Sequence, residues 1–231
     1  MKNSLAVFFD MFFTLADPCI SPETDVSDCV GMTPEEWSGY FWNSDIARRR
    51  GLGVYRTPEE IIDAACSLMP VMPADCEKAA LTAAQKEKMR RSLVDVRPDI
   101  LRMLKTLKAA GARLCVISNA DVIDICCWDE SPLREYFDAA IFSCDCGFLK
   151  PGPEIYNLGI EAVGGPYEKM YFVGDGGDGE LAGAKSAGMT AVLARYLKNR
   201  GSAADMGADF AADSPEDVVQ IILHDESMQK Y

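Results

Sequence analysis

The sequence is poor in histidine, with His224 as its single example, and it lacks a Cys-x-x-Cys pair although it contains nine cysteines. With no paired spacing and no histidine near the cysteines, a zinc site is not predicted. An odd number of cysteines without a secretory signal is typical of reduced thiols in a cytosolic protein. We therefore expect buried structural thiols and a cytoplasmic location. A soft-metal site formed by Cys126-Cys127 and Cys144-x-Cys146 is the alternative interpretation.

Long apolar runs are also missing, and no stretch of 18 apolar residues occurs, so no membrane-spanning helix is predicted. The apolar stretch after Lys2 has the superficial look of a signal peptide. Asp10 would lie in the middle of its hydrophobic region, however, and Asp17-Pro18 does not suit a cleavage site. We expect neither a signal peptide nor a membrane partner.

Basic charge is scarce. The sequence has 23 Lys and Arg against 36 Asp and Glu, which gives a net charge of -13 spread along the chain. Such a surface repels nucleic acid and anionic membranes, so neither is an expected partner. An anionic small-molecule substrate has to be attracted locally, by a metal ion or by a few placed cations. Repeats and low-complexity segments are absent too, and 231 residues are enough for one core domain with an insertion.

The N-terminal region contains the stretch around which the rest is organised. Five apolar residues, from Leu5 to Phe9, run directly into Asp10. A short continuous apolar run is typical of a strand buried on both faces of a parallel sheet. Ligands bind at the carboxyl ends of such strands. Asp10 is therefore a nucleophile, a metal ligand or a residue of the turn that follows the strand.

Residues 17–94 have helical apolar spacing and no strand-like alternation. The sequence TPEE begins at Thr33 and again at Thr57, and each copy has an N-cap threonine, a first-turn proline and acids at the positive end of a helix. The first helix is expected to end at Gly51, and a third is expected to begin at Thr82. This segment is predicted to be a small helical bundle.

From residue 95 onward, helical and strand patterns alternate. Strands are predicted at 114–117, 139–143, 170–173, 190–193 and 210–212, and helices at 98–111, in the stretch that leads to 139, at 153–163, at 180–187 and from 214. Such alternation specifies a parallel sheet covered on both faces. We predict an α/β protein with a doubly wound parallel sheet. Its core is discontinuous, built from 1–16 and 95–231, with 17–94 inserted.

Polar clusters follow four of the predicted strands, directly or one turn later. They are Asp10, Ser118-Asn119, Lys150 and Gly174-Asp175. In a doubly wound sheet these strand ends converge on one crevice. Taken singly, each residue also has an ordinary interpretation as a solvated loop lysine or a turn residue.

The ordered motifs resemble those of the haloacid dehalogenase (HAD) superfamily. The apolar strand with Asp10 and Thr14 resembles its first motif, Asp-x-Asp-x-Thr, except that Phe12 replaces the second aspartate. Ser118 matches its strand-end serine or threonine, and Lys150 stands in a segment similar to its Lys-Pro-x-Pro. The stretch from Phe172 to Met189 resembles its metal-binding loop and the following helix. The resemblance implies a HAD-like core with a helical cap inserted after the first strand.

The resemblance also implies roles for these residues. Asp10 is the expected catalytic nucleophile, because a carboxylate can form an aspartyl-phosphate. Mg²⁺ is the expected cofactor, held by Asp10, Asp175 and the main-chain carbonyl of Phe12, since hard oxygen ligands suit this ion. Lys150 is expected in catalysis and, with Ser118 and Asn119, in binding the substrate phosphate.

Two nearby acids and three arginines leave alternatives open. Glu180 lies where the family often has a second acid near the metal, whereas Asp178 lies where it could cap a helix. Arg48-Arg49-Arg50 could meet an anionic substrate or simply end a helix, where its dipole favours cations.

Phe12 stands where HAD phosphatases have their general acid/base. Loss of such a group costs about 10²–10⁴ in rate, so one interpretation is a Mg²⁺-dependent phosphate-ester hydrolase for good leaving groups, or one that borrows Asp17 or Glu23. Another is a 2-haloacid dehalogenase, because those enzymes resemble this chain in the aromatic residue after the nucleophile and in Ser-Asn, and halide needs no proton. A third is a non-catalytic phosphate-binding or regulatory protein. We expect the first, a hydrolase acting on a small phosphorylated substrate.

Overall fold

The computed structural model describes residues 5–18 and 25–224. Cys19 and Glu23, one of the two acids considered as a replacement for the missing general acid/base, lie outside the described residues. In the described part, every helix is too short or too polar to cross a bilayer.

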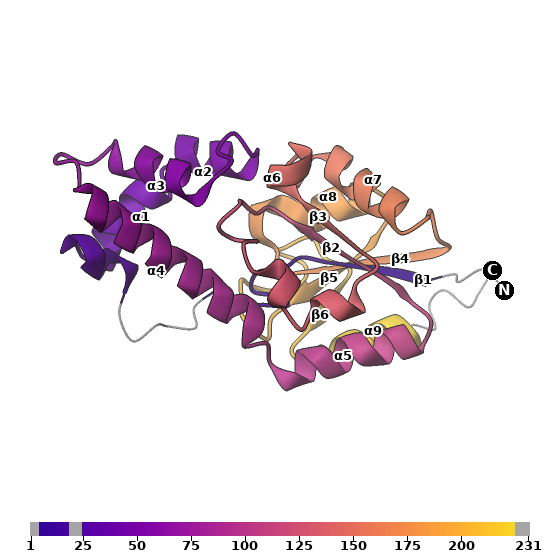
Figure 1. The fold of residues 1–231 in the computed structure, drawn as a ribbon. Helices are drawn as coiled ribbons and strands as arrows, with labels where there is room; N and C mark the ends of the chain where they lie inside the picture. Colours follow the sequence, from indigo (N-terminus) through magenta and orange to yellow (C-terminus); the bar gives the residue numbers. More distant parts are fainter. Residues whose placement is uncertain (1–4, 19–24, 225–231) are drawn as a thin grey trace.

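Six parallel strands form one sheet in the order β3-β2-β1-β4-β5-β6 (Figure 1). The strands are β1 Leu5–Phe9, β2 Arg113–Ser118, β3 Ala139–Phe142, β4 Lys169–Gly174, β5 Thr190–Ala194 and β6 Phe210–Ala212. β1 lies in the centre, with Phe9 in register with Val116 of β2 and Val173 of β4. The carboxyl ends of β1, β2 and β4 therefore lie side by side, as predicted.

Helices cover both faces of the sheet. α5 Pro98–Ala109 and α9 Pro215–His224 lie on one face, and α7 Pro153–Ala162 and α8 Glu180–Ser186 lie on the other (Figure 1). Alternate residues of β1 enter the two layers, because Val7 belongs to one apolar cluster and Phe8 to the other. The predicted doubly wound parallel α/β fold is confirmed.

The segment between β1 and α5 is helical and packs around an apolar cluster of its own. Its elements are η1 Val26–Val30, α1 Pro34–Phe41, α2 Ser44–Gly51, α3 Pro58–Cys66 and α4 Asp75–Val94. Both predicted start signals are confirmed, because Thr33 and Thr57 accept hydrogen bonds from the amides of Glu36 and Glu60, each at 3.2 Å. These bonds satisfy amides that the first helical turn leaves without partners.

Local details of the helical segment differ from the prediction. The first helix is divided after Phe41, because the Asn43 side chain accepts the amide of Asp45 at 3.1 Å and begins α2. α4 begins at Asp75 rather than Thr82, since Glu77 caps the amide of Ala74 at 2.7 Å. Capping side chains set these two helix starts, and they cannot be recognised from apolar spacing alone.

The stretch between β2 and β3 was expected to be helical and is not. It contains only the short 3-10 turns η2 Trp128–Glu130 and η3 Arg134–Tyr136 among its described elements. Asp121 accepts the amides of Ile123 at 2.6 Å and Asp124 at 3.0 Å, which stabilises a turn in place of a helix. Ser143, expected to end β3, instead begins α6 Ser143–Cys146.

Candidate active site

Asp10 is the first residue beyond the central strand. Its amide donates to the carbonyl of Val173 at 2.9 Å, so the hydrogen bonding of β1 to β4 continues through this residue. The chain turns immediately afterwards, with the amides of Leu15 and Ala16 both bonded to the carbonyl of Met11. The carboxylate is buried, and Thr14 donates to its Oδ2 at 3.4 Å.

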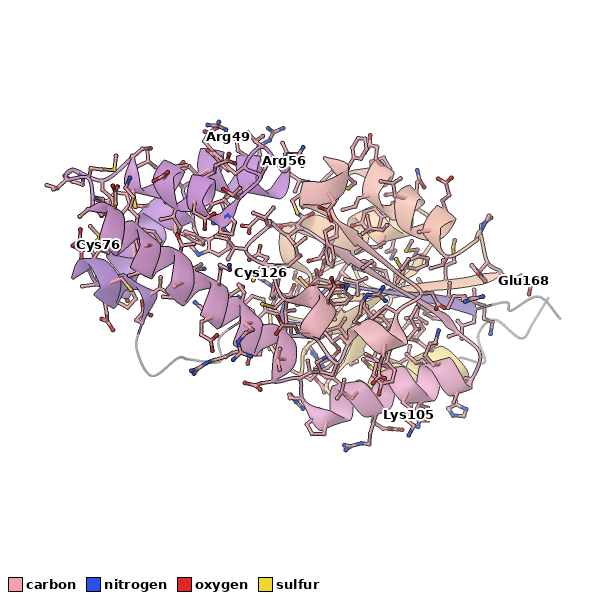
Figure 2. The ribbon with its side chains drawn as sticks, in the orientation of Figure 1. Arg49, Arg56, Cys76, Lys105, Cys126 and Glu168 are labelled. Carbon is pink, nitrogen blue, oxygen red and sulfur yellow. The ribbon has the colours of Figure 1, made fainter. Side chains whose placement is uncertain are left out.

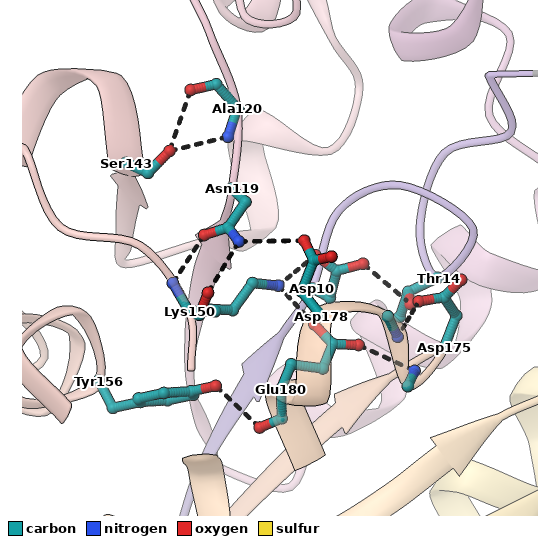
Figure 3. A network of polar contacts seen from close by, with 12 residues as sticks. Asp10, Thr14, Asn119, Ala120, Ser143, Lys150, Tyr156, Asp175, Asp178 and Glu180 are labelled. Atoms are coloured by element: carbon teal, nitrogen blue, oxygen red, sulfur yellow. Dashed lines mark hydrogen bonds and ion pairs between the residues drawn. The ribbon is translucent and has the colours of Figure 1, made fainter. Parts of the chain in front are cut away.

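Lys150 is not the solvated loop lysine that its position before proline also allowed. Its side chain is buried, and its Nζ lies 2.5 Å from Asp10 Oδ1 and 2.5 Å from Glu180 Oε2 (Figure 3). Burial lowers the pKa of the Lys150 ammonium, but the charges of Asp10 and Glu180 oppose this effect and hold the pKa above its usual range. Lys150 is thus a fixed positive charge in contact with the predicted nucleophile.

Asn119 holds the segment that carries Lys150. Its Oδ1 accepts the Lys150 amide at 2.7 Å, and its Nδ2 donates to the Lys150 carbonyl at 3.1 Å and to Asp178 Oδ2 at 3.2 Å. Asn119 was predicted to bind substrate oxygens, but in this structure its amide positions the lysine (Figure 3). Asp178 does not cap α8, because Gly179 occupies the N-cap position.

Ser118, unlike Asn119, has a side chain without a hydrogen-bond partner in the described part of the chain. Its side chain is 1% exposed, and its Oγ is buried without a hydrogen-bond partner among the described residues. A buried hydroxyl without a partner costs about 1–3 kcal/mol. An oxygen of a bound substrate would remove that cost, so this observation agrees with the predicted role of Ser118.

Glu180 joins the site, which the sequence left open. Its carboxylate is buried, and Oε1 accepts the amide of Gly176 at 3.0 Å. A Cβ at Gly174 would come within 2.3 Å of the same oxygen, so only glycine leaves room for this carboxylate at the end of β4. The Tyr156 hydroxyl donates to the main-chain carbonyl of Glu180 at 2.8 Å.

Asp175 has a partner that sequence reasoning missed. Its Oδ1 accepts the amide of Gly177 at 3.0 Å, and its Oδ2 accepts Arg200 Nε at 2.7 Å. Arg200 belongs to the segment after β5, where no sequence pattern indicates that its side chain returns to the end of β4. The guanidinium is one-third exposed, whereas Asp175 is buried.

Three carboxylates therefore meet in a buried site. Asp10, Asp175 and Glu180 each offer one oxygen, and these oxygens all lie within 4.8 Å of one another. Burial, together with the charge of Asp175, raises the pKa of Asp10 against the effect of Lys150. Burial and the charge of Asp10 raise the pKa of Glu180 to about 8, although Lys150 opposes the shift. A hard divalent cation fits this donor set, because it would relieve the excess negative charge.

Phe12 lies at the junction of the two halves of the molecule. It is partly buried and packs against both the larger core cluster and the cluster of the helical segment. It also lines a cavity of about 520 Å³ between them, together with Trp37, Phe41, Trp42 and Met89. The aromatic ring that replaces an acid thus forms part of an apolar wall.

A second cavity of about 450 Å³ includes Lys150, Asp178 and Arg48 in its lining. Asn119 and Asp124 line both cavities, so the two cavities are neighbours. Of the arginine triplet, Arg48, which is exposed, and Arg50, which is buried, both line the second cavity. The triplet does end a helix, since it forms the last turn of α2.

Arg50 is the buried member of that triplet and connects the helical segment to the core. Its Nε donates to Asp121 Oδ2 at 2.6 Å, its Nη1 donates to the Phe41 carbonyl at 2.9 Å, and its Cζ lies 3.8 Å from the Phe41 ring centroid. Next to this pair, burial and the charge of Asp121 raise the pKa of Asp124 to about 7. The contacts of Arg50 with Asp121 and Phe41 are not predictable from local sequence.

The cysteines do not form a comparable cluster. Cys126 Sγ and Cys127 Sγ lie 3.5 Å apart (Cys126 is labelled in Figure 2), but among the described residues no cysteine belongs to a group of three or more metal-ligating side chains. Cys66, Cys115 and Cys144 are buried free thiols, as expected of structural cysteines. The soft-metal alternative has no support from this part of the chain.

Comparison with known proteins shows the family of the chain. The sequence matches the haloacid dehalogenase-like hydrolase family over residues 6–188. The chain belongs to this family of hydrolytic enzymes, which includes phosphatases and dehalogenases.

Individual relatives represent both activities. A glyceraldehyde 3-phosphate phosphatase of Methanocaldococcus jannaschii is 30% identical over 128 residues, 54% of this chain and 55% of the relative. The matched region thus spans about half the length of this curated relative. The crystal structure of an L-2-haloacid dehalogenase has a TM-score of 0.68 at 22% identity, covering 95% of this chain and 98% of the other. A HAD phosphatase from Thermococcus onnurineus has a TM-score of 0.60 at 24% identity, covering 94% and 97%. At these identities, the structural similarity establishes the fold.

Proposed function

We propose that this protein is a Mg²⁺-dependent phosphate-ester hydrolase that works through an aspartyl-phosphate on Asp10. The observation that supports this most directly is the buried cluster in which Lys150 contacts both Asp10 and Glu180 beside Asp175. Phosphoryl transfer needs an oriented nucleophile and compensated charge around the phosphoryl oxygens. The sequence relatives that include a glyceraldehyde 3-phosphate phosphatase favour a small phosphorylated substrate.

The nucleophile is the Oδ2 atom of Asp10. Lys150 binds Oδ1 at 2.5 Å, while Oδ2 has the longer contact of 3.4 Å with Thr14. Oδ2 forms a bond to phosphorus, the bond from phosphorus to the ester oxygen breaks, and that oxygen leaves with the electron pair. Water then hydrolyses the aspartyl-phosphate and regenerates Asp10. Lys150 and the unpaired hydroxyl of Ser118 hold the phosphoryl oxygens.

Mg²⁺ would be held by Asp10, Asp175 and the main-chain carbonyl of Phe12, with Glu180 close enough to take part. It would supply positive charge that offsets the developing charge on the phosphoryl oxygens. Arg200 has to leave Asp175 Oδ2 before that oxygen can bind a cation, and its partial exposure permits this.

The absence of an acid at position 12 selects the leaving group. Phe12 can neither protonate the ester oxygen nor activate water. Esters whose alcohol is already a weak base need no such proton, so they are the expected substrates. Breakdown of the aspartyl-phosphate is then the slow step.

We also propose that residues 17–94 act as a cap over a core formed by 1–16 and 95–231. The cavity of about 520 Å³ is lined by both parts, which supports a role of the helical segment in enclosing the substrate. A cap excludes water from the reaction and contributes to substrate choice. The expected cytoplasmic location stays a prediction.

A 2-haloacid dehalogenase is the second candidate, and Phe12 favours it because halide leaves without a proton. The cluster of three buried acids argues against it, since attack on a carbon–halogen bond has no use for a divalent cation site.

One screen separates the two candidates. Phosphate monoesters, acyl phosphates and 2-haloacids are each incubated with wild type, with and without Mg²⁺, and with Asp10→Asn as the control. Release of phosphate that requires Mg²⁺ and Asp10 is the expected result. Halide release without added metal would instead support the dehalogenase, and the absence of both products would support a binding protein.

A further inference from the structure

We propose that the cavity between the helical segment and the core binds an aromatic leaving group, so that the preferred substrates are aryl phosphate monoesters whose ring carries one hydrogen-bonding substituent. This inference rests on the proposed phosphate-ester hydrolase and specifies its substrate class. It depends on the walls of the cavity, on one unpaired amide and on the residue at position 12.

The walls are built largely from rings. Phe12, Trp37, Phe41 and Trp42 line the cavity of about 520 Å³, and Trp42 is 59% exposed in spite of its size. A cavity of this volume holds a ring with a substituent, because small-molecule sites are commonly about 300–1,000 Å³. Burying an aromatic ligand there would also cover the exposed face of Trp42, and offset or edge-to-face ring contacts add to the binding.

Gln85 is a buried polar residue of the wall, which also includes Asp25, Ser38, Lys88, Asn119 and Asp124. It lies on α4 beside Met89, is only 5% exposed, and has no hydrogen-bond partner among residues 5–18 and 25–224. The side chain is nearly buried, so its amide has limited contact with water and no protein group to take its hydrogen bonds, which is unfavourable. A hydroxyl or carbonyl on the ring of a bound substrate would provide the missing partner.

The fixed charges of the cavity do not select a second anion. Lys88 lines the wall, but its charge already acts on Asp25, whose pKa it helps to lower. The other acid of the lining, Asp124, accepts the amide of Asp121 at 3.0 Å and lies beside the Arg50–Asp121 ion pair. A carboxylated leaving group would therefore meet two acids, Asp25 and Asp124, and one cation, Lys88.

Phe12 is consistent both with a leaving group that needs no proton and with an apolar wall that holds an aryl ring. An aryl ester releases a phenolate, which leaves with the electron pair of the broken bond and takes its proton from water afterwards. No acid is needed at position 12 for that step, and the ring of Phe12 instead contributes to the wall that contacts the departing aryl group. One residue thus accounts for both the missing acid and the apolar pocket.

Binding of phosphonates, which cannot be hydrolysed, tests the inference separately from turnover. Calorimetry with Mg²⁺ present would compare methylphosphonate, benzylphosphonate and para-hydroxybenzylphosphonate. We expect benzylphosphonate to bind about tenfold or more tightly than methylphosphonate, because the ring buries apolar surface. The hydroxyl should add about three- to tenfold in wild type through Gln85.

Two variants and a control locate the effect. Gln85→Leu should abolish the gain from the hydroxyl and keep the gain from the ring, whereas Lys86→Leu, at the exposed neighbouring position of α4, should change neither. Ser38→Trp, at an exposed position of the cavity wall, should fill the space and abolish the gain from the ring while methylphosphonate binding stays the same.

The outcomes separate this inference from the function on which it rests. If methylphosphonate and benzylphosphonate bind equally to wild type, the aryl assignment is wrong while the phosphate site stands. If no phosphonate binds, the proposed function itself is contradicted. A hydroxyl gain that persists in Gln85→Leu would overturn the role given to Gln85.

Discussion

Single side chains in this site are distinguished by whether protein groups already satisfy them. The side-chain amide of Asn119 is hydrogen-bonded to the main chain of Lys150 and to Asp178. Ser118 Oγ, at the preceding position, is buried and has no partner among the described residues. The first is expected to position the catalytic lysine, and the second to bind substrate.

Removing the Ser118 hydroxyl should therefore affect binding and spare stability. Ser118→Ala is expected to leave the free energy of unfolding unchanged or to raise it by about 1 kcal/mol, and to weaken binding of inorganic phosphate about three- to tenfold. Ser92→Ala is the matched control, because its Oγ is also buried without a partner in the described structure but is not part of the site. Denaturant unfolding and calorimetry measure the two effects. Unchanged phosphate affinity in Ser118→Ala would remove Ser118 from the site.

Asp124 should make stability depend on pH. Its pKa is raised to about 7 from 3.8, mainly by burial and by the charge of Asp121, with Arg50 acting in the opposite direction. Between these values the folded protein keeps the proton and the unfolded chain releases it, so this group's contribution to stability falls as pH rises from about 4 to 7 and is constant above. Asp124→Asn cannot titrate. Its stability relative to wild type should therefore increase over that range in urea unfolding, and a constant difference would contradict the raised pKa.

At the scale of elements, the segment between β5 and β6 places Arg200 on the metal-ligand candidate Asp175. Arg200→Ala should raise the affinity for Mg²⁺ a few-fold, because a partly exposed ion pair is worth up to about 1 kcal/mol and competes for Asp175 Oδ2. Arg195→Ala is the control, since Arg195 lies in the same segment but pairs with Asp213 after β6. Calorimetric titration with Mg²⁺ measures both. Weaker Mg²⁺ binding in Arg200→Ala would show that the arginine supports the site.

The elements themselves were largely predictable from the sequence. The apolar runs that became β1, β2, β4, β5 and β6 lie within about one residue of the predicted strands, and TPEE marked two helix starts. The stretch after Asn119 was predicted wrongly, because the Asp121 carboxylate binds backbone amides that a helix would have used. Hydrophobic periodicity gives no information about side chains that compete with a helix for backbone amides.

In the site, too, residues at strand ends were predictable from the sequence, and contacts between distant segments were not. The sequence predicted Asp10, Ser118, Lys150 and Asp175 because each lies at the end of a predicted strand or shortly after it, and parallel strands align their carboxyl ends. Arg200 and the Arg50–Asp121 pair were not found, since they depend on how distant segments return to the sheet. The cluster of three carboxylates likewise became evident only in the structure, where Glu180 is buried and shares Lys150 with Asp10.

At the scale of the whole molecule, a buried ion pair connects the helical segment to the sheet. Arg50 and Asp121 are both almost completely buried, 2.5 Å apart from Nη2 to Oδ2. Arg50→Met should lower the free energy of unfolding by about 3–5 kcal/mol, because it leaves Asp121 buried without its partner. Adding Asp121→Asn should recover part of that loss, and denaturant unfolding of both variants measures the coupling. Additive losses would mean that the pair does not act as a unit.

Hydrolysis through an aspartyl-phosphate requires that Asp10 be phosphorylated during turnover, and the absence of an acid at Phe12 should slow the release of that phosphoryl group. The direct measurement is mass spectrometry of enzyme quenched in acid within milliseconds of mixing with an activated aryl phosphate and Mg²⁺. Wild type should carry one phosphoryl group on the peptide that contains Asp10, Phe12→Asp should carry less while turning over faster, and Asp10→Asn should carry none. Full turnover by wild type with Asp10 never phosphorylated would contradict the proposed function.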